Sequence, residues 1–326
     1  MTNISLPQGV KDILPEEAER VRQVASGISS ILEGYGFKRV ITPLLEYLDV
    51  LSLGLEADLK DRVFKFVDPA TGRIVAIRPD ITPQVARVVA SRMRDCPRPI
   101  KVWYDESVLR YPAQGGKPRE LFQVGAEYIG SSSPEADAEL IIIAIEVLKG
   151  LGLEDFKIDI GDVGFFKRLL KGLEIDKEIE ARVREVVSIK DRSALEGLLP
   201  ALVWRKGEEA GELLMELPAL FGGRDVINRA RGLVKGDISS ALDNLDCILD
   251  IIEKKGYAGF VTVDLGEVRG FDYYTGVIFE GFARGVGKAL LTGGRYDNLL
   301  ERYGWPSPAT GLAFDVENII EGLERQ

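Results

Sequence analysis

The alternation of apolar and polar positions predicts a helix close to the start of the chain. Apolar side chains recur every three or four residues, the spacing of one helix face, at Val21, Val24, Ile28, Ile31 and Leu32. Pro15, Glu16 and Glu17 suit the first turn of such a helix, and Gly34 and Gly36 suit its end.

The next apolar segments, residues 37–51 and 73–80, are typical of short strands and a turn. A helix is predicted to follow, because Thr82 offers a side chain for an N-cap and Pro83 suits the first helical position. The apolar face of this helix consists of Val85, Val88, Val89 and Met93. Asp80 and Thr82 are therefore expected at a strand-to-helix corner.

Residues 99–111 and 119–130 predict two more strands, joined by a glycine-rich, basic loop. A period of two in the second strand puts on one face Phe122, Val124, Ala126 and Tyr128. The other face carries Gln123, Gly125 and Glu127. Gln123 and Glu127 lie roughly 13 Å apart along a strand, which excludes a paired acid and base. A polar face around a glycine suggests a floor on which something else lies.

The rest of the chain divides into regions of different composition and periodicity. Charged, leucine-rich segments with helical periodicity fill residues 164–256 and predict an all-helical insertion. This insertion interrupts a core of residues 1–163 and 257–326. Further elements are a helix after Ser133 and Pro134, strands at 155–163, 259–265, 267–282 and 288–292, and glycine turns leading into helices at 293–304 and 310–326.

Composition narrows the class of protein. The 326 residues are 45% hydrophobic and 29% charged, as in an ordinary globular protein. No segment reaches the roughly 18–20 apolar residues of a membrane span, and the first residues lack the layout of a signal peptide, so a cytoplasmic protein is expected. Cys96 and Cys247 belong to no CxxC pair, which favours two reduced structural thiols over a zinc site or disulfide.

Charge and histidine content change the picture further. The 42 basic and 52 acidic side chains give a formal charge of -10 and a pI near 4.9, which opposes a nucleic-acid partner. The chain contains 0 histidines. The commonest general base and the commonest metal ligand are therefore absent, and we expect neither a metal nor a cofactor.

The segment "EVRGFDYYTGVIFEGF", residues 267–282, places polar groups in what is otherwise a strand pattern. One interpretation is a binding site, since Gly270 and Gly276 allow the close approach of a ligand. Another is an ordinary strand whose arginine and aspartate pair at a hairpin end. Asp80 and Glu127 can likewise be surface charges, and "GGRYD" can be a phosphate loop or a plain turn.

Read in order, five blocks resemble the catalytic domain of histidyl-tRNA synthetases, a class II aminoacyl-tRNA synthetase family. These blocks are "RPDIT", "LRY" with "RELFQVGAE", "VRGFDYYTG", "GGRYD" and "TGLAFDVEN". The resemblance covers nearly the whole chain. It implies an α+β fold with an antiparallel sheet flanked by helices, a dimer formed through residues 34–47, and a histidine pocket in the sheet.

The resemblance also assigns residues to that pocket. Glu127 and Tyr274 would face the imidazole of histidine, with Tyr273 beside them and Gln123 in the same lining. A carboxylate and a phenol suit a ring that both donates and accepts hydrogen bonds.

The other end of the ligand is assigned in the same way. Thr82, with Asp80 where the synthetases have a glutamate, would meet the α-amino group. Arg110 and Arg269 would address the carboxylate or the α-phosphate. Guanidinium groups pair well with such anions.

Departures from the synthetase pattern lie at the ATP end. Tyr111 follows Arg110 where the synthetases have a glutamate. Asn318 replaces an arginine that grips the γ-phosphate, and Asp315 replaces a glycine. Loss of one such clamp costs roughly 10²- to 10³-fold in rate. No anticodon-binding domain follows before Gln326. We therefore expect no amino-acid activation, no catalytic residue and no tRNA partner.

A synthetase-like chain with these departures resembles the regulatory subunits of ATP phosphoribosyltransferase. That resemblance implies a non-catalytic subunit that the short-form catalytic subunit needs for the first step of histidine biosynthesis and for feedback by histidine. It also implies a hetero-octamer of four regulatory and four catalytic chains. A protein required when histidine is scarce benefits from containing none, which fits the composition.

Two other functions stay open at this point. One is a truncated synthetase-like enzyme that activates histidine with ATP for an acceptor other than tRNA. The other is a histidine sensor that acts without a partner. The first needs a working ATP clamp, against which Asp315 and Asn318 argue. The second predicts tight histidine binding by the isolated chain.

Overall fold

The computed structural model describes residues 5–111, 119–173, 175–198, 209–233 and 238–326. Most of the predicted basic loop, residues 112–119, lies outside this set. Among the described residues no helix is long and apolar enough to cross a membrane, and no cluster of acidic or cysteine side chains is arranged to hold a metal ion. Cys96 is exposed and Cys247 is partly buried, and both are free thiols.

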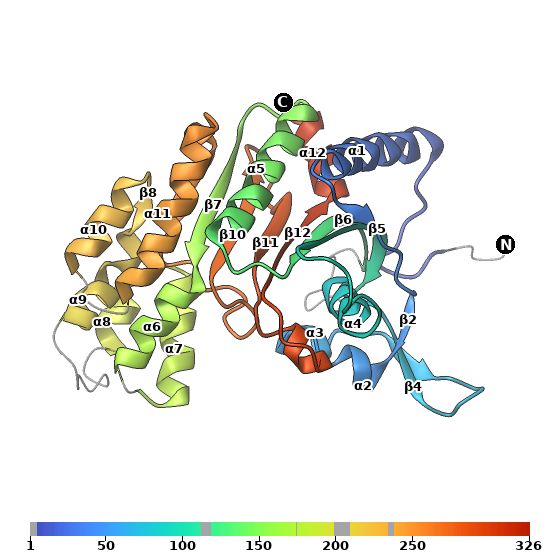
Figure 1. The fold of residues 1–326 in the computed structure, drawn as a ribbon, viewed down its shortest axis with the longest axis horizontal. Helices are drawn as coiled ribbons and strands as arrows, with labels where there is room; N and C mark the ends of the chain where they lie inside the picture. The colour runs from blue at the N-terminus through green and yellow to red at the C-terminus, as the bar shows by residue number, and fades with distance from the viewer. Residues whose placement is uncertain (1–4, 112–118, 174, 199–208, 234–237) are drawn as a thin grey trace.

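A mixed nine-stranded sheet forms the centre of the molecule (Figure 1). Its strands in spatial order are β1 (Lys38–Arg39), β5 (Ile100–Leu109), β6 (Glu120–Ile129), β12 (Ala309–Asp315), β11 (Leu291–Arg295), β10 (Val277–Ala283), β7 (Phe156–Asp162), β9 (Val261–Asp264) and β8 (Phe221–Gly222). The prediction of an antiparallel sheet is right for its centre. Towards the edges, β1 runs parallel to β5 and β9 runs parallel to β7.

Three helices pack on one face of this sheet: α1 (Pro15–Gly34), α5 (Pro134–Gly150) and α12 (Val316–Glu324). The helix predicted at the start of the chain is confirmed, and its apolar stripe buries Val24, Ile28 and Leu32 in the main core. The α5 helix is apolar nearly all round because α1, α11 and the sheet enclose it.

Smaller elements cover the other face and frame the site described below. A three-stranded sheet consists of β2 (Leu45–Tyr47), β4 (Ile74–Ile77) and β3 (Lys65–Val67), and short helices are α2 (Leu48–Leu51), α3 (Ala57–Lys60), α4 (Thr82–Arg92) and η5 (Leu300–Tyr303). A second apolar cluster joins α4, η5 and this face of β5, and it includes Val85, Tyr104 and Leu300. The site therefore lies on the face of the sheet opposite α1 and α5.

The region between β7 and β9 lies to one side of the large sheet (Figure 1). It contains α6 (Val163–Leu173), α7 (Lys177–Ser188), α8 (Arg192–Leu198), α9 (Glu209–Glu216), η2 (Leu217–Ala219), α10 (Asp225–Leu233) and α11 (Ser239–Lys254), followed by η4 (Ala258–Phe260). The prediction that this region is all-helical is wrong at β8, because Phe221 and Gly222 pair with β9 at the sheet edge. The division of the chain into a core and an insertion stays a prediction.

Two glycine segments that predict turns are strands in the structure. Gly293 and Gly294 lie in β11, and Gly311 lies in β12. A Cβ on Gly293 would stand 2.4 Å from the Phe279 ring and 2.6 Å from the Gly311 carbonyl oxygen. Glycine is required at these positions because neighbouring groups occupy the space that a side chain would need. Such packing across strands cannot be read from one segment of sequence.

Arg295, in the "GGRYD" block, is buried and is not part of an open phosphate loop. Its Nε donates to Asp137 at 3.0 Å, and its other nitrogens donate to Asp297 and to the carbonyls of Ser131 and Ser133. The arginine thus fastens β11 to the start of α5. Burial raises the pKa of Asp137 to about 6, and the charge of Arg295 opposes this rise.

We predict that Arg295→Leu lowers the free energy of unfolding by about 3–5 kcal/mol, because it leaves Asp137 buried without its cation. The loss should be smaller at pH 5 than at pH 7, since protonation of Asp137 removes the unpaired charge. Urea denaturation at the two pH values measures both effects. The control is Arg325→Leu, whose exposed pair with Glu321 is worth at most about 1 kcal/mol. Equal losses in both variants would contradict the prediction.

Candidate functional site

A cavity of about 250 Å³ opens above the centre of the large sheet. Seven of the eight side chains predicted for a ligand pocket line it: Asp80, Thr82, Arg110, Gln123, Glu127, Tyr273 and Tyr274. They come from the corner before α4, the end of β5, the strand β6, and the turn before β10. The cavity is smaller than the roughly 300–1,000 Å³ pockets that take drug-sized ligands, so it suits a ligand of amino-acid size.

Glycines give the cavity its floor. Gly311 of β12 lies directly opposite Glu127 of β6, and a Cβ on Gly311 would stand 1.8 Å from Glu127 Oε2. A Cβ on Gly125 would stand 2.4 Å from Tyr104 Oη. Both clashes are severe. Gly311 lines the cavity, whereas Gly125 does not: the side-chain space above Gly125 is filled by the Tyr104 ring, so the predicted floor around Gly125 supports a tyrosine of the neighbouring strand.

Glu127 is the most deeply buried acid in the pocket. Its Oε1 accepts hydrogen bonds from Thr82 Oγ1 at 2.7 Å and from Tyr104 Oη at 3.4 Å, and its Oε2 accepts one from Tyr296 Oη. Burial raises the pKa of Glu127 to about 8, although the hydrogen bonds from Tyr296 and Thr82 lower it. The carboxyl is thus held in one orientation and gains from a ligand that donates a hydrogen bond or a positive charge.

The corner before α4 differs from its prediction in one respect. Ile81 takes the N-cap position, and Thr82 is the first helical residue. The Thr82 hydroxyl is not available as a cap because it donates to Glu127 across the pocket. Asp80 Oδ1 instead accepts from the Ile81 amide at 2.8 Å. A pocket contact has therefore displaced the local capping that the sequence favours.

Asp80 and Arg110 form the charged end of the pocket. Burial raises the pKa of Asp80, and the positive charge of Arg110 opposes this rise. Arg110 Nε donates to the Pro79 carbonyl at 2.6 Å, which fixes the guanidinium beside the corner. Glu127 is 1% exposed and Asp80 is partly buried beside Arg110, so neither of these two acids is an ordinary surface charge. A carboxylate and a guanidinium side by side suit a zwitterionic ligand.

Two polar atoms of the lining have no hydrogen-bond partner among the residues that the structure describes. They are Gln123 Oε1 and Tyr273 Oη, and both are buried. Buried polar groups are nearly always hydrogen-bonded, so an unpaired pair in one cavity points to a ligand that completes them. The Tyr273 ring is held between Tyr274 and Tyr296, at centroid distances of 5.1 and 5.4 Å. Its hydroxyl is therefore presented by a rigid aromatic group.

The structure does not bring Arg269 into this cavity. Its guanidinium forms ion pairs with Glu267 and Glu280, and it lines a neighbouring hollow beside α7. The alternative in which Arg269 pairs with Asp272 is wrong, because Asp272 pairs with Arg184. The polar part of this segment is also not a strand, since β10 begins only at Val277. The preceding residues form turns around Gly270, whose φ of +62° few other residues adopt.

Tyr296 is a pocket residue to which the sequence assigns no role. It follows β11, lies next to Tyr273, and donates to Glu127. The available signal was its position directly after a strand in the "GGRYD" block. Glu56 also lines the cavity, from just before α3. Nothing in its local sequence distinguishes it from a surface acid.

The two departures at the ATP end have structural uses here. Asp315 is the N-cap of α12, where its Oδ1 accepts from the Asn318 amide at 3.0 Å. The Asn318 side-chain amide donates to the Ala289 carbonyl at 2.8 Å. Both side chains are therefore engaged with their own backbone surroundings. Neither supplies the cation that the synthetases place at this helix start.

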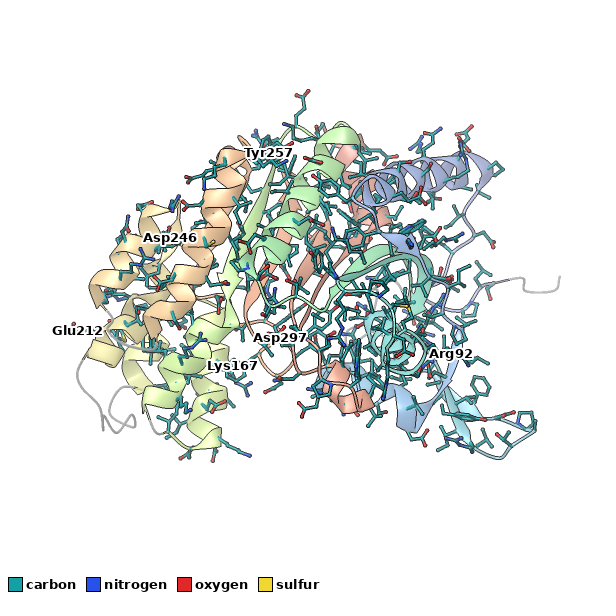
Figure 2. The ribbon with its side chains drawn as sticks, in the orientation of Figure 1. Arg92, Lys167, Glu212, Asp246, Tyr257 and Asp297 are labelled. Atoms are coloured by element: carbon teal, nitrogen blue, oxygen red, sulfur yellow. The ribbon has the colours of Figure 1, made fainter. Side chains whose placement is uncertain are left out.

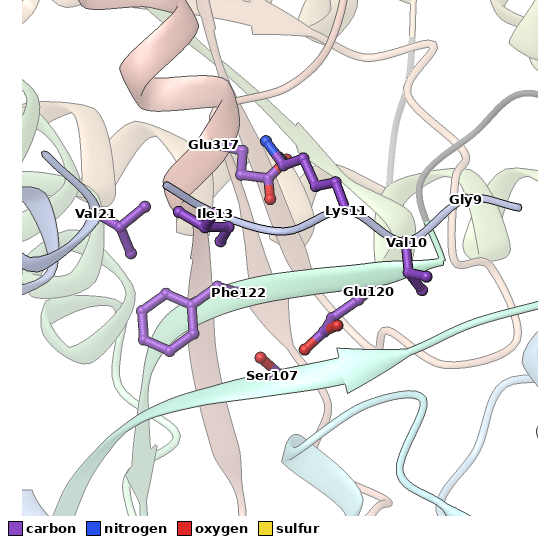
Figure 3. A pocket seen from close by; sticks show the side chains of 9 residues that line it. All are labelled: Gly9, Val10, Lys11, Ile13, Val21, Ser107, Glu120, Phe122 and Glu317. Atoms are coloured by element: carbon purple, nitrogen blue, oxygen red, sulfur yellow. Dashed lines mark ion pairs between the residues drawn. The ribbon is translucent and has the colours of Figure 1, made fainter. Parts of the chain in front are cut away.

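A second cavity, of about 380 Å³, lies on the other side of β6 (Figure 3). Phe122, Val10 and Ile13 form its apolar part, and Lys11 spans it towards Glu317 at 3.6 Å. None of the predicted pocket residues lines it. Since Phe122 and Gln123 point to opposite faces of one strand, the two cavities are separated by the sheet.

We predict that Glu127→Gln changes how stability depends on pH. The folded protein keeps the proton of Glu127 up to about pH 8, whereas the unfolded chain releases it near 4.5. Wild-type stability therefore falls as pH rises between these values, by up to about 1.4 kcal/mol per unit for this group. The variant lacks this slope, so its free energy of unfolding should rise relative to that of the wild type from pH 5 to pH 8. Urea denaturation tests this, and a constant difference across the range would refute it.

Comparison with known proteins identifies the family of the chain. The sequence profile of the histidyl-tRNA synthetase family matches residues 9–319. An ATP phosphoribosyltransferase regulatory subunit from Geobacter metallireducens is 47% identical over 323 residues, which cover 98% of this chain and 74% of that protein. A protein of the same name from Clostridium botulinum is 37% identical, over 99% of this chain and 77% of its own.

Solved structures agree. A crystal structure titled as an ATP phosphoribosyltransferase regulatory subunit/histidyl-tRNA synthetase from Bacillus halodurans superposes with a TM-score of 0.90 and 33% identity, over 99% of this chain and 84% of the other. Apo histidyl-tRNA synthetase from S. aureus shares the fold, with a TM-score of 0.67 and 24% identity over 98% and 74% of the two chains. The chain therefore belongs to the histidyl-tRNA synthetase-like family of ATP phosphoribosyltransferase regulatory subunits.

Proposed function

We propose that this protein is a non-catalytic subunit that activates the short-form catalytic subunit of ATP phosphoribosyltransferase and mediates feedback by histidine. The observation that supports the proposal is the difference between two parts of the fold, the pocket around Glu127 and the start of α12. The pocket around Glu127 is of amino-acid size and is lined by hydrogen-bonding groups. At the position where the synthetases bind ATP, Asp315 instead caps α12 and Asn318 bonds the Ala289 carbonyl.

The pocket chemistry supports a histidine-like ligand. Glu127 and the unpaired Gln123 Oε1 offer acceptors to imidazole or ammonium N–H groups. Asp80 supplies a second acid, and Arg110 is placed to receive a carboxylate. Tyr273 and Tyr274 form an aromatic wall against which a flat ring can pack. Arg269 is not needed for this mode of binding.

The assembly we propose is a cytoplasmic hetero-octamer of four such chains and four catalytic chains, built on a dimer of this chain through residues 34–47. Exposed apolar side chains in that segment support the dimer. Ile41 is 67% exposed and Leu44 is 53% exposed, and Leu45 beside them is 43% exposed. Large apolar side chains clustered on a surface mark protein interfaces. We also propose that residues 1–163 and 257–326 form the core and residues 164–256 the insertion.

We predict that this chain alone catalyses no histidine-dependent exchange of pyrophosphate into ATP, because the cationic clamp is absent. Mixed with a short-form catalytic subunit, it should switch on the formation of phosphoribosyl-ATP, and added histidine should reduce that rate. Radiolabel exchange and a continuous absorbance assay measure the two activities. Robust exchange without activation on mixing would point instead to the truncated synthetase-like enzyme. Tight histidine binding with no effect on the partner would point to a stand-alone sensor.

We further predict that Gly311→Ala abolishes or strongly weakens histidine binding. The new Cβ must displace Glu127 Oε2, which lies 1.8 Å from its position, and Tyr296 Oη at 2.8 Å. The matched control is Gly287→Ala, since nothing lies within 4 Å of a Cβ there. Calorimetry on the two variants gives the comparison. Unchanged affinity in Gly311→Ala would show that the ligand does not enter this pocket.

A further inference from the structure

The turn that carries the pocket tyrosines touches the helical insertion on its other side. This turn, residues 265–276, connects β9 to β10 and presents Tyr273 and Tyr274 to the cavity. Between β9 and these tyrosines, Phe271 and Asp272 point towards the insertion helices α6 and α7. One short segment is therefore both a wall of the pocket and a contact of the insertion.

Phe271 is held by three side chains of the insertion. Its ring meets Phe166 edge to face at a centroid distance of 5.9 Å. Arg184 lies over the same ring at 4.6 Å, and Lys167 lies over it at 5.0 Å. Arg184 also forms an ion pair with Asp272 at 3.3 Å. Cations over an aromatic face add attraction to apolar packing, so this contact is specific as well as close.

Lys167 makes the most direct connection to the pocket. Its Nζ donates to the Tyr274 carbonyl oxygen at 2.7 Å, while the Tyr274 side chain lines the cavity. Within the described residues, Lys167 has no carboxylate within ion-pair distance, and it is half-buried on α6 (Figure 2). Its ammonium therefore interacts with a backbone oxygen of the pocket wall, with the Phe271 ring and with the nearby charge of Asp272. Hydrogen bonds from charged donors are stronger than those between neutral groups.

The turn is stiff enough to transmit this contact. The amides of Tyr273 and Tyr274 both donate to the Gly270 carbonyl oxygen at 2.9 Å. Gly270 takes a positive φ, and a Cβ there would stand 2.4 Å from the Tyr274 ring. Arg269 ties the start of the turn to Glu280 of β10. A shift of Phe271 or of the Tyr274 carbonyl must then move the two tyrosines.

We infer that Lys167 is a positioning residue of the pocket. We also infer that the packing of α6 and α7 is coupled, through the turn 265–276, to ligand binding in the pocket. A ligand that fixes Tyr273 and Tyr274 favours the docked position of the insertion, and a docked insertion raises affinity for the ligand. This coupling is reciprocal by thermodynamic necessity. The regulatory part of the inference rests on the proposed function, whereas the positioning part rests on the contacts alone.

The test compares Lys167→Met with Lys171→Met. Both lysines lie on α6, and Lys171 is exposed one turn further on. Without ligand, amide hydrogen exchange of residues 270–276 should be about tenfold faster in Lys167→Met than in wild type, which corresponds to about 1.4 kcal/mol of opening free energy. Lys171→Met should behave as wild type. Equal exchange in the two variants overturns the positioning role.

Histidine is then added to the same three proteins. In wild type and Lys171→Met it should slow exchange in α6 and α7, and its Kd should be about tenfold tighter than in Lys167→Met. Equal affinity and equal slowing in Lys167→Met overturn the coupling. If wild type binds no histidine, the proposed ligand is wrong, and the ligand-free exchange alone decides the role of Lys167.

Asp272→Asn provides a second variant if Lys167→Met is poorly folded. Asp272 is 76% exposed at its side chain and does not line the pocket. The substitution keeps the shape of the residue and removes the ion pair with Arg184. It should speed exchange of residues 270–276 by a smaller factor, about two- to threefold, because exposed ion pairs are weak. If exchange of residues 270–276 is unchanged in both Lys167→Met and Asp272→Asn, the inference is overturned.

Discussion

The burial of one carboxyl group, that of Glu127, organises this structure. A buried acid is unfavourable unless hydrogen bonds hold it, and here the donors come from α4, from β5 and from the residue after β11. Gly311, which faces Glu127 from the neighbouring strand β12, must carry no side chain. The start of α4, the register of the central strands and the position of Tyr296 therefore all follow from accommodating Glu127.

In the proposed function, the amino-acid pocket is retained while the ATP-binding end beside it is lost. Glu127 and its hydrogen-bond donors come from four separate elements of the core, so the pocket depends on the packing of the whole sheet. The ATP end needs only a helix start and one cation. Asp315 and Asn318 convert that start into a capped helix, which favours stability over phosphate binding. In the proposed function, recognition of an amino acid is thus separate from its activation.

Much of the site could be predicted from the sequence because its residues lie in short motif blocks that resemble those of histidyl-tRNA synthetases, whereas periodicity alone left a surface role equally open. The period of two in β6 placed Gln123 and Glu127 on one face, and the corner before α4 brought Asp80 and Thr82 together. The N-cap role of Thr82 was misread, since its hydroxyl donates to Glu127, 45 residues further along the chain. Arg269 was misplaced for the same reason, because Glu280 holds it from another strand.

The sequence by itself determined the apolar faces of α1 and β6, the charge balance and the motif order that indicates the family, because these depend on local periodicity and residue type. Only the tertiary structure decided which glycines lie in strands, where Arg269 points and which insertion side chains touch the pocket wall. Those features depend on atoms brought together from distant segments. The contact between Lys167 and the Tyr274 carbonyl, 107 residues apart, is set by packing and leaves no pattern in either segment.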